Sequence, residues 1–545
     1  MGGPVALVLG ILLAAGPAAA GAQDTVAATL RPLIASATLP LARWPDFSPH
    51  AEAVARLYAS RADAALWLDR GRPTAAAREA LTALANAGAH GLDPGDYDAA
   101  TLDRIAATVP SGRAARDLAR FDLLLTVDML RLLDDLRSGR LAAAPYARAR
   151  GTEARVDLAA LLSEALRAGT VAQLVAASAP PLTQYRNLQR MLALYSRLAA
   201  DATLGPVDAG GPVRPGDRFP QIAMLRRRLR VVGDLPVGVA DTGAVYGPAD
   251  VAAVRRFQWR HGLRRDGILG GATLSALNTP FSRRARQIEL AMERLRWLPP
   301  LERRRFLLVN VPAFALFAFD STGGSGSPSR WMKVVVGKAV DTRTPMLYAE
   351  IRAVEFRPYW NVPRSILVKE LLPTLRRQPG YLRAQAMEVV DADGRAMGDE
   401  VTADVLRRLS RGELRVRQRP GPHNALGLVK FDLPNPADVA LHGTPDSLLF
   451  GRTRRDFSHG CIRVEDPVGL AEWVLRDRPE WGRAEIERAM AGRSSRRVVL
   501  TRPIPVAVYY TTAVAFPDGT VHFYPDVYGL DRVLDQALRG RALTS

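Results

Sequence analysis

Apolar residues between 50 and 205 recur at steps of three and four, which is the spacing of one helix face. The longest run is Leu118, Phe121, Leu125, Met129, Leu132 and Leu136, and a later one is Leu188, Leu192, Tyr195 and Leu198. Sequence rich in Gly and Pro at 205–215 ends the pattern. This part of the chain shows no cluster of reactive residues. We therefore expect a helical scaffold, and we interpret its polar residues as surface.

Residues 217–279 carry three shorter helical stripes separated by turn sequences. The stripes are Ile222, Leu225 and Leu229, then Val251, Val254 and Phe257, then Leu274 and Leu277. The separating sequences include Asp241-Thr242-Gly243 and Asp266-Gly267, which favour turns. The pattern predicts a compact module of three helices.

From Arg305 onward the pattern changes to β-branched or alternating runs, which predict strands. These runs are Phe306–Val311, Trp331–Val336, Ile351–Phe356 and Arg497–Thr501. A helical stretch at Ser365–Leu375, followed by polar sequence up to Asn424, interrupts them. We expect a mainly β domain whose insertion, residues 364–424, is a candidate lid over the site.

The composition of the chain limits the classes of protein to which it can belong. The chain has 545 residues, of which 48% are hydrophobic, enough for several cores. The net charge is +19, but the basic residues are almost all arginines scattered over every segment, rather than a basic patch with interleaved aromatics. We therefore do not expect nucleic-acid binding. The densest runs, Arg226–Arg228 and Arg303–Arg305, are interpreted as solvated faces.

The N-terminus has the features of an export signal, although no Lys or Arg precedes its apolar run at Val5–Ala15. Small residues at Ala20-Gly21-Ala22 offer a cleavage site before Gln23. The run is shorter than the roughly 20 residues that a membrane span needs. We expect residues 1–22 to be a signal peptide, no transmembrane segment, and a protein exported to the periplasm.

Cys461 is the only cysteine, and it lies in Ser458-His459-Gly460-Cys461-Ile462-Arg463, downstream of Leu441-His442-Gly443-Thr444. A thiol becomes nucleophilic when an imidazole takes its proton, and glycine allows backbone N–H groups to approach an oxyanion. In an oxidising compartment an unpaired thiol is a liability, so its presence indicates that the thiol itself is used. These residues predict an acyl-transfer site.

Two alternatives remain open from the residues alone. The thiol could be a small buried hydrophobe, or His442, His459 and Cys461 could bind zinc, although no fourth ligand stands nearby. The spacing also leaves open which histidine would take the proton.

Longer stretches of sequence resemble known families. The sequence Ala253–Gln258, His261-Gly262-Leu263, Asp266–Gly270 and Thr273–Asn278 is similar to the peptidoglycan-binding domain of cell-wall enzymes. The two histidine motifs resemble the L,D-transpeptidase catalytic domain, which crosslinks peptidoglycan. Met292–Trp297, Pro358–Pro363 and Gly421–Gly427 look like the large, scaffold-containing members of that family.

The resemblance implies a role for each site residue. Cys461 would be the nucleophile and His442 its base, with Gly443 orienting the imidazole through its carbonyl. His459 and Gly460 would belong to the oxyanion environment together with the Cys461 N–H. Arg463 would anchor a substrate carboxylate, with a surface ion pair to Glu465 or Asp466 as the alternative. Ser458 and Thr444 are also candidate substrate-binding residues, although such hydroxyls commonly stabilise loops.

The resemblance also implies a multidomain α+β protein that needs no metal or organic cofactor. Its predicted parts are a signal peptide (1–22), a helical scaffold (23–212), a peptidoglycan-binding domain (213–280), a linker helix (281–304), a catalytic domain (305–504), and C-terminal strands and a helix (505–545).

The expected partners are peptidoglycan stem peptides and glycan strands. The expected reaction forms 3→3 crosslinks through a cysteine acyl-enzyme and releases D-alanine from a tetrapeptide donor. Inhibition by carbapenem-type β-lactams is expected by the same resemblance. The alternatives are an L,D-carboxypeptidase or endopeptidase that trims stems, and a non-catalytic wall-binding protein.

Overall fold

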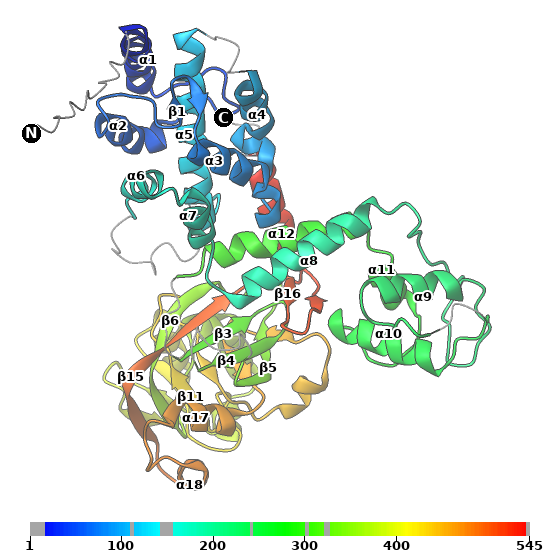
Figure 1. The fold of residues 1–545 in the computed structure, drawn as a ribbon. Helices are drawn as coiled ribbons and strands as arrows, with labels where there is room; N and C mark the ends of the chain where they lie inside the picture. The colour runs from blue at the N-terminus through cyan, green and yellow to red at the C-terminus, as the bar shows by residue number, and fades with distance from the viewer. Residues whose placement is uncertain are drawn as a thin grey trace, which may run out of the picture. The chain divides into compact units, whose positions relative to one another are not determined.

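The structure is a computed structural model that describes residues 17–108, 114–141, 156–239, 243–299, 305–320 and 328–540 (Figure 1). Contacts divide the chain into two compact units, one of residues 1–142, 152–181 and 535–545 and the other of residues 143–151 and 182–534. Most of the predicted signal peptide, residues 1–16, lies outside the described residues, and α1 begins at Pro17. Within the described residues, no helix combines the length and apolarity that a membrane crossing requires.

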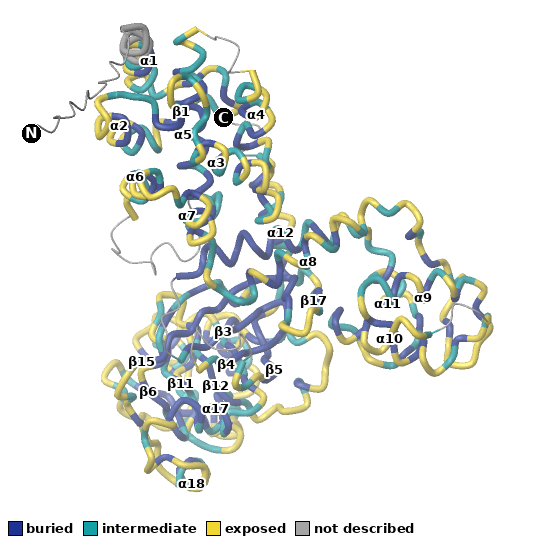
Figure 2. Tube along the Cα trace, in the orientation of Figure 1, coloured by how far each residue is buried: buried dark blue, intermediate teal, exposed yellow. Residues whose placement is uncertain are grey.

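The first unit is the helical scaffold. Its helices are α1 (Pro17–Ser36), α2 (Ala51–Ala59), α3 (Ala75–Ala85), α4 (Ala99–Thr108), α5 (Ala115–Ser138), α6 (Leu158–Ala168) and α7 (Val171–Ser178), with a short hairpin of β1 (Leu68–Asp69) and β2 (Arg72–Pro73). The long helix α5 is buried on nearly every side (Figure 2). It therefore forms the centre of this unit.

The interpretation of the scaffold's polar residues as surface is wrong for α5, where Asp122, Thr126 and Asp128 are fully buried. The Asp122 carboxylate accepts hydrogen bonds from the backbone N–H groups of Leu66 and Trp67 at 2.9 and 2.8 Å. It fixes the hairpin segment on the helix. Burial is the main cause that raises the pKa of Asp122 to about 6. Sequence periodicity could not reveal this, because the partners are two backbone N–H groups and the Tyr58 hydroxyl, all more than 50 residues away in the sequence.

The predicted three-helix module is confirmed. It consists of α9 (Ile222–Val231), α10 (Pro248–Arg260) and α11 (Gly271–Leu277). The apolar stripes meet in one core that includes Leu225, Val254 and Leu277.

The run Arg226–Arg228 is not a solvated face, because two of its members are buried. Arg226 forms a two-pronged ion pair with Asp250 at 2.8 and 2.9 Å. Arg228 donates to the Leu277 carbonyl at 2.6 Å. In the other run, Arg303 and Arg304 lie outside the described residues, and Arg305 donates to the Trp473 carbonyl at 2.7 Å.

Helices α8 (Thr183–Ala200) and α12 (Phe281–Arg296) pack against each other in the second unit. The α12 segment, predicted as a linker helix, has a buried C-terminal half. There Arg296 forms an ion pair with Glu293 at 2.7 Å and donates to the Tyr185 hydroxyl at 3.0 Å. These contacts make α12 a packed element of the unit.

The predicted mainly β catalytic domain is confirmed, and its sheet closes into a barrel. The strands are β3 (Phe306–Asn310), β4 (Ala315–Phe319), β5 (Arg330–Gly337), β6 (Leu347–Phe356), β11 (Val429–Asp432), β12 (Leu441–His442), β13 (Asp456–Ser458), β14 (Ile462–Val464) and β15 (Arg496–Tyr509). The order is β13-β5-β14-β12-β11-β6-β15-β3-β4, and β4 also pairs with β5. The helices α17 (Pro467–Leu475) and α18 (Arg483–Ala491) contact β11 and β6 respectively.

The insertion is a lobe with its own core, and it contains a sheet as well as helices. Its helices are α13 (Arg364–Ile366), α14 (Leu372–Arg377), α15 (Tyr381–Ala384) and α16 (Ala403–Arg411), and a π-helical turn spans Leu367–Leu371. Its sheet has the order β7 (Trp360–Asn361), β10 (Arg415–Gln418), β8 (Met387–Val390), β9 (Ala396–Gly398). The Asn424 amide donates to the carbonyls of Pro358 and Arg419 at 3.1 and 3.0 Å, which ties the two ends of the lobe together.

The C-terminal segment continues the barrel. Strand β15 runs through residue 504, the boundary predicted from sequence, and pairs with β3 up to Tyr509. The segment then forms the hairpin β16 (Ala513–Ala515) and β17 (Val521–Phe523) and the helix α19 (Leu530–Gly540).

Candidate active site

The pairing of two short parallel strands places the two motifs side by side. In β12 and β14, Leu441 lies opposite Ile462 and His442 lies opposite Arg463. Side chains two residues apart on a strand share a face, and directly opposed residues point to the same side. Cys461, which precedes β14, therefore shares a face of this strand pair with Arg463 and His442.

His442 is buried and held in one tautomer. Its Nδ1 lies 2.6 Å from the Gly443 carbonyl, which can only accept, so Nδ1 carries the proton and Nε2 keeps a free lone pair. Burial is the first cause that lowers the pKa of His442 to about 4, and the charges of Arg463 and Lys430 lower it further. At neutral pH the imidazole is therefore uncharged and can accept a proton.

The Cys461 thiol is partly buried. Its sulfur accepts a hydrogen bond from the Ala440 N–H at 3.4 Å and lies 4.0 Å from the Asp438 carbonyl. Burial raises the pKa of the thiol, although Ala440, Arg463 and Lys430 each favour the thiolate. Among the described residues, the thiol forms no hydrogen bond with His442 or His459. The resting site thus favours a neutral thiol beside a neutral imidazole.

The turn that precedes Cys461 is stabilised by the hydroxyl group of Ser458. Ser458 Oγ donates to the Cys461 carbonyl at 2.5 Å and accepts from the Gly460 N–H at 3.2 Å. Gly460 has φ +112°, a conformation that disfavours any side chain. Thr444 Oγ1 accepts from the Asp446 N–H at 3.2 Å. Both hydroxyls therefore stabilise turns in this structure.

His459 faces the insertion instead of the thiol. Its Nε2 lies 2.6 Å from Glu370 Oε1, on the π-helical turn of the lobe.

The Arg463 side chain makes no hydrogen bond or ion pair with any described residue, although the residue is half-buried. The ion-pair alternative is not formed, because Glu465 pairs with Lys333 at 3.1 Å and Asp466 with Arg330 at 3.2 Å. Its pKa is lowered by burial. An uncompensated guanidinium beside the thiol is suited to binding a carboxylate.

Sequence reasoning noted Gly421–Gly427 without giving the segment a role. Gly427 has φ +67°, and a Cβ there would lie 2.6 Å from the Thr444 backbone nitrogen. Only glycine allows this segment to lie against the His442-Gly443-Thr444 backbone. Lys430, opposite His442 in β11, was also missed, since register and not sequence distance brings it there.

Within the described part of the chain, no three His, Cys, Asp or Glu side chains gather as ligands for a metal ion. Of the three residues in the zinc alternative, His459 is bonded to Glu370 through Nε2, and His442 is bonded to the Gly443 carbonyl through Nδ1.

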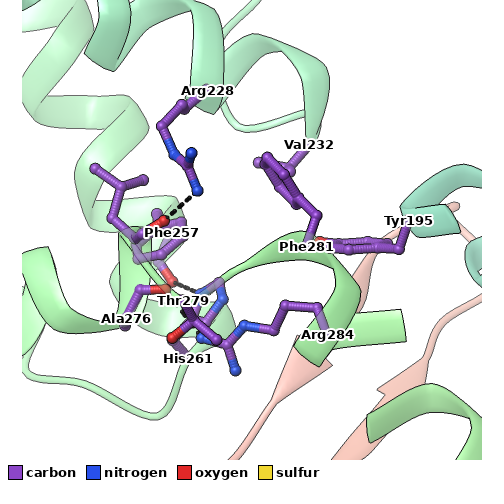
Figure 3. A pocket seen from close by; sticks show the side chains of 10 residues that line it. Tyr195, Arg228, Val232, Phe257, His261, Ala276, Thr279, Phe281 and Arg284 are labelled. Carbon is purple, nitrogen blue, oxygen red and sulfur yellow. Dashed lines mark hydrogen bonds between the residues drawn. The ribbon is translucent and has the colours of Figure 1, made fainter. Parts of the chain in front are cut away.

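A separate, shallow pocket lies where the three-helix module meets α8 and α12 (Figure 3). Its two arginines both point to the C-terminal carbonyls of α11: Arg228 donates to Leu277 at 2.6 Å and Arg284 to Ala276 at 3.0 Å. The last carbonyls of a helix lack partners and carry partial negative charge. Arg228 thus closes the module on itself, whereas Arg284 joins the module to α12. None of the lining residues belongs to the surroundings of the thiol.

Three family models match successive parts of the chain. A scaffold domain matches residues 52–192, a domain described as "Putative peptidoglycan binding domain" matches residues 219–277, and the L,D-transpeptidase catalytic domain matches residues 304–499. The chain carries an L,D-transpeptidase catalytic domain. The resemblance to that family expected from the motifs is confirmed.

One curated relative also carries the family's name. A Haemophilus influenzae protein named "Putative L,D-transpeptidase" is 31% identical over 251 residues, which cover 46% of this chain and 49% of that protein. The chain thus spans about half the length of this curated relative. A solved structure of an L,D-transpeptidase (residues 123–326) from Xylanimonas cellulosilytica is 17% identical and covers 55% of this chain and 99% of its own, but its TM-score is 0.18, too low to support an argument.

The raised pKa of the thiol predicts how it alkylates. Iodoacetamide reacts with the thiolate, so the alkylation rate should rise with pH and reach its midpoint above the ordinary value of about 8.5. Mass spectrometry reports the adduct, and Cys461→Ala is the control because the chain has no other cysteine. A midpoint below pH 7 would show a preformed thiolate and would contradict a resting site with a neutral thiol and a neutral imidazole.

Proposed function

We propose that this protein is a cysteine-dependent L,D-transpeptidase that forms 3→3 crosslinks in peptidoglycan. The observation that carries the proposal is the shared face of Cys461, His442 and Arg463 on β12 and β14. It combines a nucleophile, a neutral base and an unpaired cation within one catalytic domain.

In the first step, the thiol attacks the amide carbonyl of the third, diamino-acid residue of a donor tetrapeptide. His442 Nε2 accepts the thiol proton as the C–S bond forms, since its lowered pKa keeps it unprotonated. The C–N bond then breaks, the imidazolium returns the proton to the leaving amine, and D-alanine departs. The product is a thioester on Cys461.

In the second step, the side-chain amine of another stem attacks the thioester. An amide forms, the C–S bond breaks, and the sulfur recovers the proton through His442. Water in place of the amine would give an L,D-carboxypeptidase. No metal or organic cofactor takes part in either step.

Arg463 is proposed to bind the carboxylate of the donor, and Lys430 to add to the positive potential around the reacting atoms. Both charges favour the thiolate and disfavour the imidazolium. They therefore favour an anion at the moment when negative charge develops on the substrate.

The three-helix module is proposed to hold the enzyme on peptidoglycan strands, in line with the description of the domain that it matches. A substrate of this kind places the protein in the periplasm, exported by the predicted signal at residues 1–22. Neither nucleic acid nor a transmembrane anchor is part of this proposal.

The lobe of residues 364–424 is proposed to act as a lid, supported by the Glu370–His459 contact beside the thiol. Both side chains are partly exposed, so the pair is worth at most about 1 kcal/mol, or about fivefold. Glu370→Ala should raise the KM for the donor by up to about that factor, while Glu413→Ala, elsewhere on the lobe, should not. An unchanged KM in both variants would contradict a lid held by this contact.

The direct test of function is product analysis. Purified protein is incubated with peptidoglycan rich in tetrapeptide stems, and the digested fragments are weighed. The wild type should yield 3→3 dimers and free D-alanine, whereas Cys461→Ala should yield neither. Trimmed tripeptides without dimers would support the carboxypeptidase alternative, and unchanged stems would support a binding protein.

The Arg463 assignment predicts a loss that depends on the substrate. A charge-assisted hydrogen bond contributes about 1.5–3 kcal/mol, so Arg463→Gln should lower kcat/KM for a tetrapeptide donor by roughly 10–150-fold. For a donor whose terminal carboxylate is an amide, the same substitution should change kcat/KM by less than about threefold. Equal losses for both donors would mean that Arg463 does not bind this carboxylate.

A further inference from the structure

The segment that follows the matched residues, 304–499, reaches back to the loop 337–344, which in turn contacts the turn that carries the nucleophile. Its contact is Tyr528, a buried residue just before α19. The Tyr528 hydroxyl donates to the Gly337 carbonyl at 2.6 Å and accepts from the Thr344 N–H at 3.2 Å. One hydroxyl thus ties together the two ends of the loop 337–344.

This loop closes tightly and is hydrogen-bonded to the turn of residues 458–461, which carries Cys461 and is called the catalytic turn below. A Cβ on Gly337 would lie 1.9 Å from the Thr342 carbonyl, so only glycine permits the closure. Two loop hydroxyls reach the turn: Thr342 Oγ1 donates to the Ser458 carbonyl at 3.1 Å, and Thr344 Oγ1 donates to the Gly460 carbonyl at 2.8 Å. Thr344 Oγ1 also accepts from the Gly337 N–H at 2.8 Å, which leaves its proton for Gly460.

The Gly460 carbonyl and the Cys461 N–H belong to one planar peptide unit and point in opposite directions. Fixing the carbonyl therefore fixes the direction of the N–H. The Cys461 N–H donates to no described residue, whereas the neighbouring Ile462 N–H is bonded to the Ala440 carbonyl at 2.8 Å. A free N–H on the nucleophile residue is suited to bind the oxyanion that forms when the thiol attacks.

We propose that Tyr528, acting through Thr344, is a positioning residue that aims the Cys461 N–H at the oxyanion of the transition state. The expected effect on kcat rests on the proposed function. The orientation of the Cys461 N–H, in contrast, can be measured without turnover. It makes the C-terminal segment, residues 505–540, part of the catalytic machinery's support.

The test uses full-length protein with three variants and one control. Tyr528→Phe removes the hydroxyl, Thr344→Val removes the donor to Gly460, and Thr344→Ser retains it. Tyr524→Phe is the control, because its partly buried hydroxyl lies in the same segment and contacts His522 at 3.4 Å instead of the loop. Tyr528→Phe and Thr344→Val should lower kcat for the donor about 10–100-fold with KM within about twofold, since loss of a whole oxyanion donor costs about 10²–10³.

Iodoacetamide separates positioning from folding, because alkylation of the thiol develops no oxyanion. Its rate should stay within about twofold of the wild type in all variants, and Thr344→Ser should retain most of kcat. Unchanged kcat in Tyr528→Phe and Thr344→Val, or a parallel fall of kcat and alkylation, would overturn the inference.

Selective ¹⁵N-cysteine labelling gives a readout that does not need activity. The chain has a single cysteine, so the spectrum contains one amide signal, that of Cys461. The signal should move in Tyr528→Phe and Thr344→Val and stay in place in Tyr524→Phe. A signal that stays in place in all variants overturns the inference even where the wild type shows no turnover, a result that would count separately against the proposed function.

Discussion

The parallel pairing of β12 with β14 is the constraint on which the rest of the site depends. Two strands of two and three residues set the register in which His442 faces Arg463, and Cys461 lies one step before the pair. A shift by one residue would turn Cys461 and Arg463 to the opposite face. The barrel supplies the rigidity, since β12 and β14 are each bordered on their outer side by a further strand, β11 and β5.

Electrostatics then decide the resting state of the site. Lys430, His442 and Arg463 lie in one row across β11, β12 and β14, so the imidazole is flanked by two cations. Burial and these charges keep His442 neutral, while burial keeps the thiol protonated. The same cations favour negative charge on sulfur and on substrate. The site is therefore organised for charge that appears during attack, and it does not store a thiolate beforehand.

The sequence predicted the fold class because each part has a clear period: helical stripes such as Leu225 and Leu229, and alternating runs such as Ile351–Phe356. Motif spacing was also sufficient to identify Cys461 and His442 as candidates. Contacts that depend on register or on distant segments could not be foreseen. Glu370 and Thr344 reach the catalytic turn from separate elements, and Tyr528 reaches it only through Thr344. Asp122 binds two backbone N–H groups and the Tyr58 hydroxyl, which are distant in sequence and leave no periodic signal.

In the proposed mechanism, a neutral His442 takes the proton from Cys461 as the thiol attacks the donor stem. Intact-mass spectrometry after rapid mixing with a tetrapeptide donor measures this step directly, before any acceptor is added. We expect an acyl adduct, with loss of D-alanine, on the wild type within the time of one turnover and a strongly delayed adduct on His442→Ala. Equal rates of adduct formation in the two proteins would contradict it.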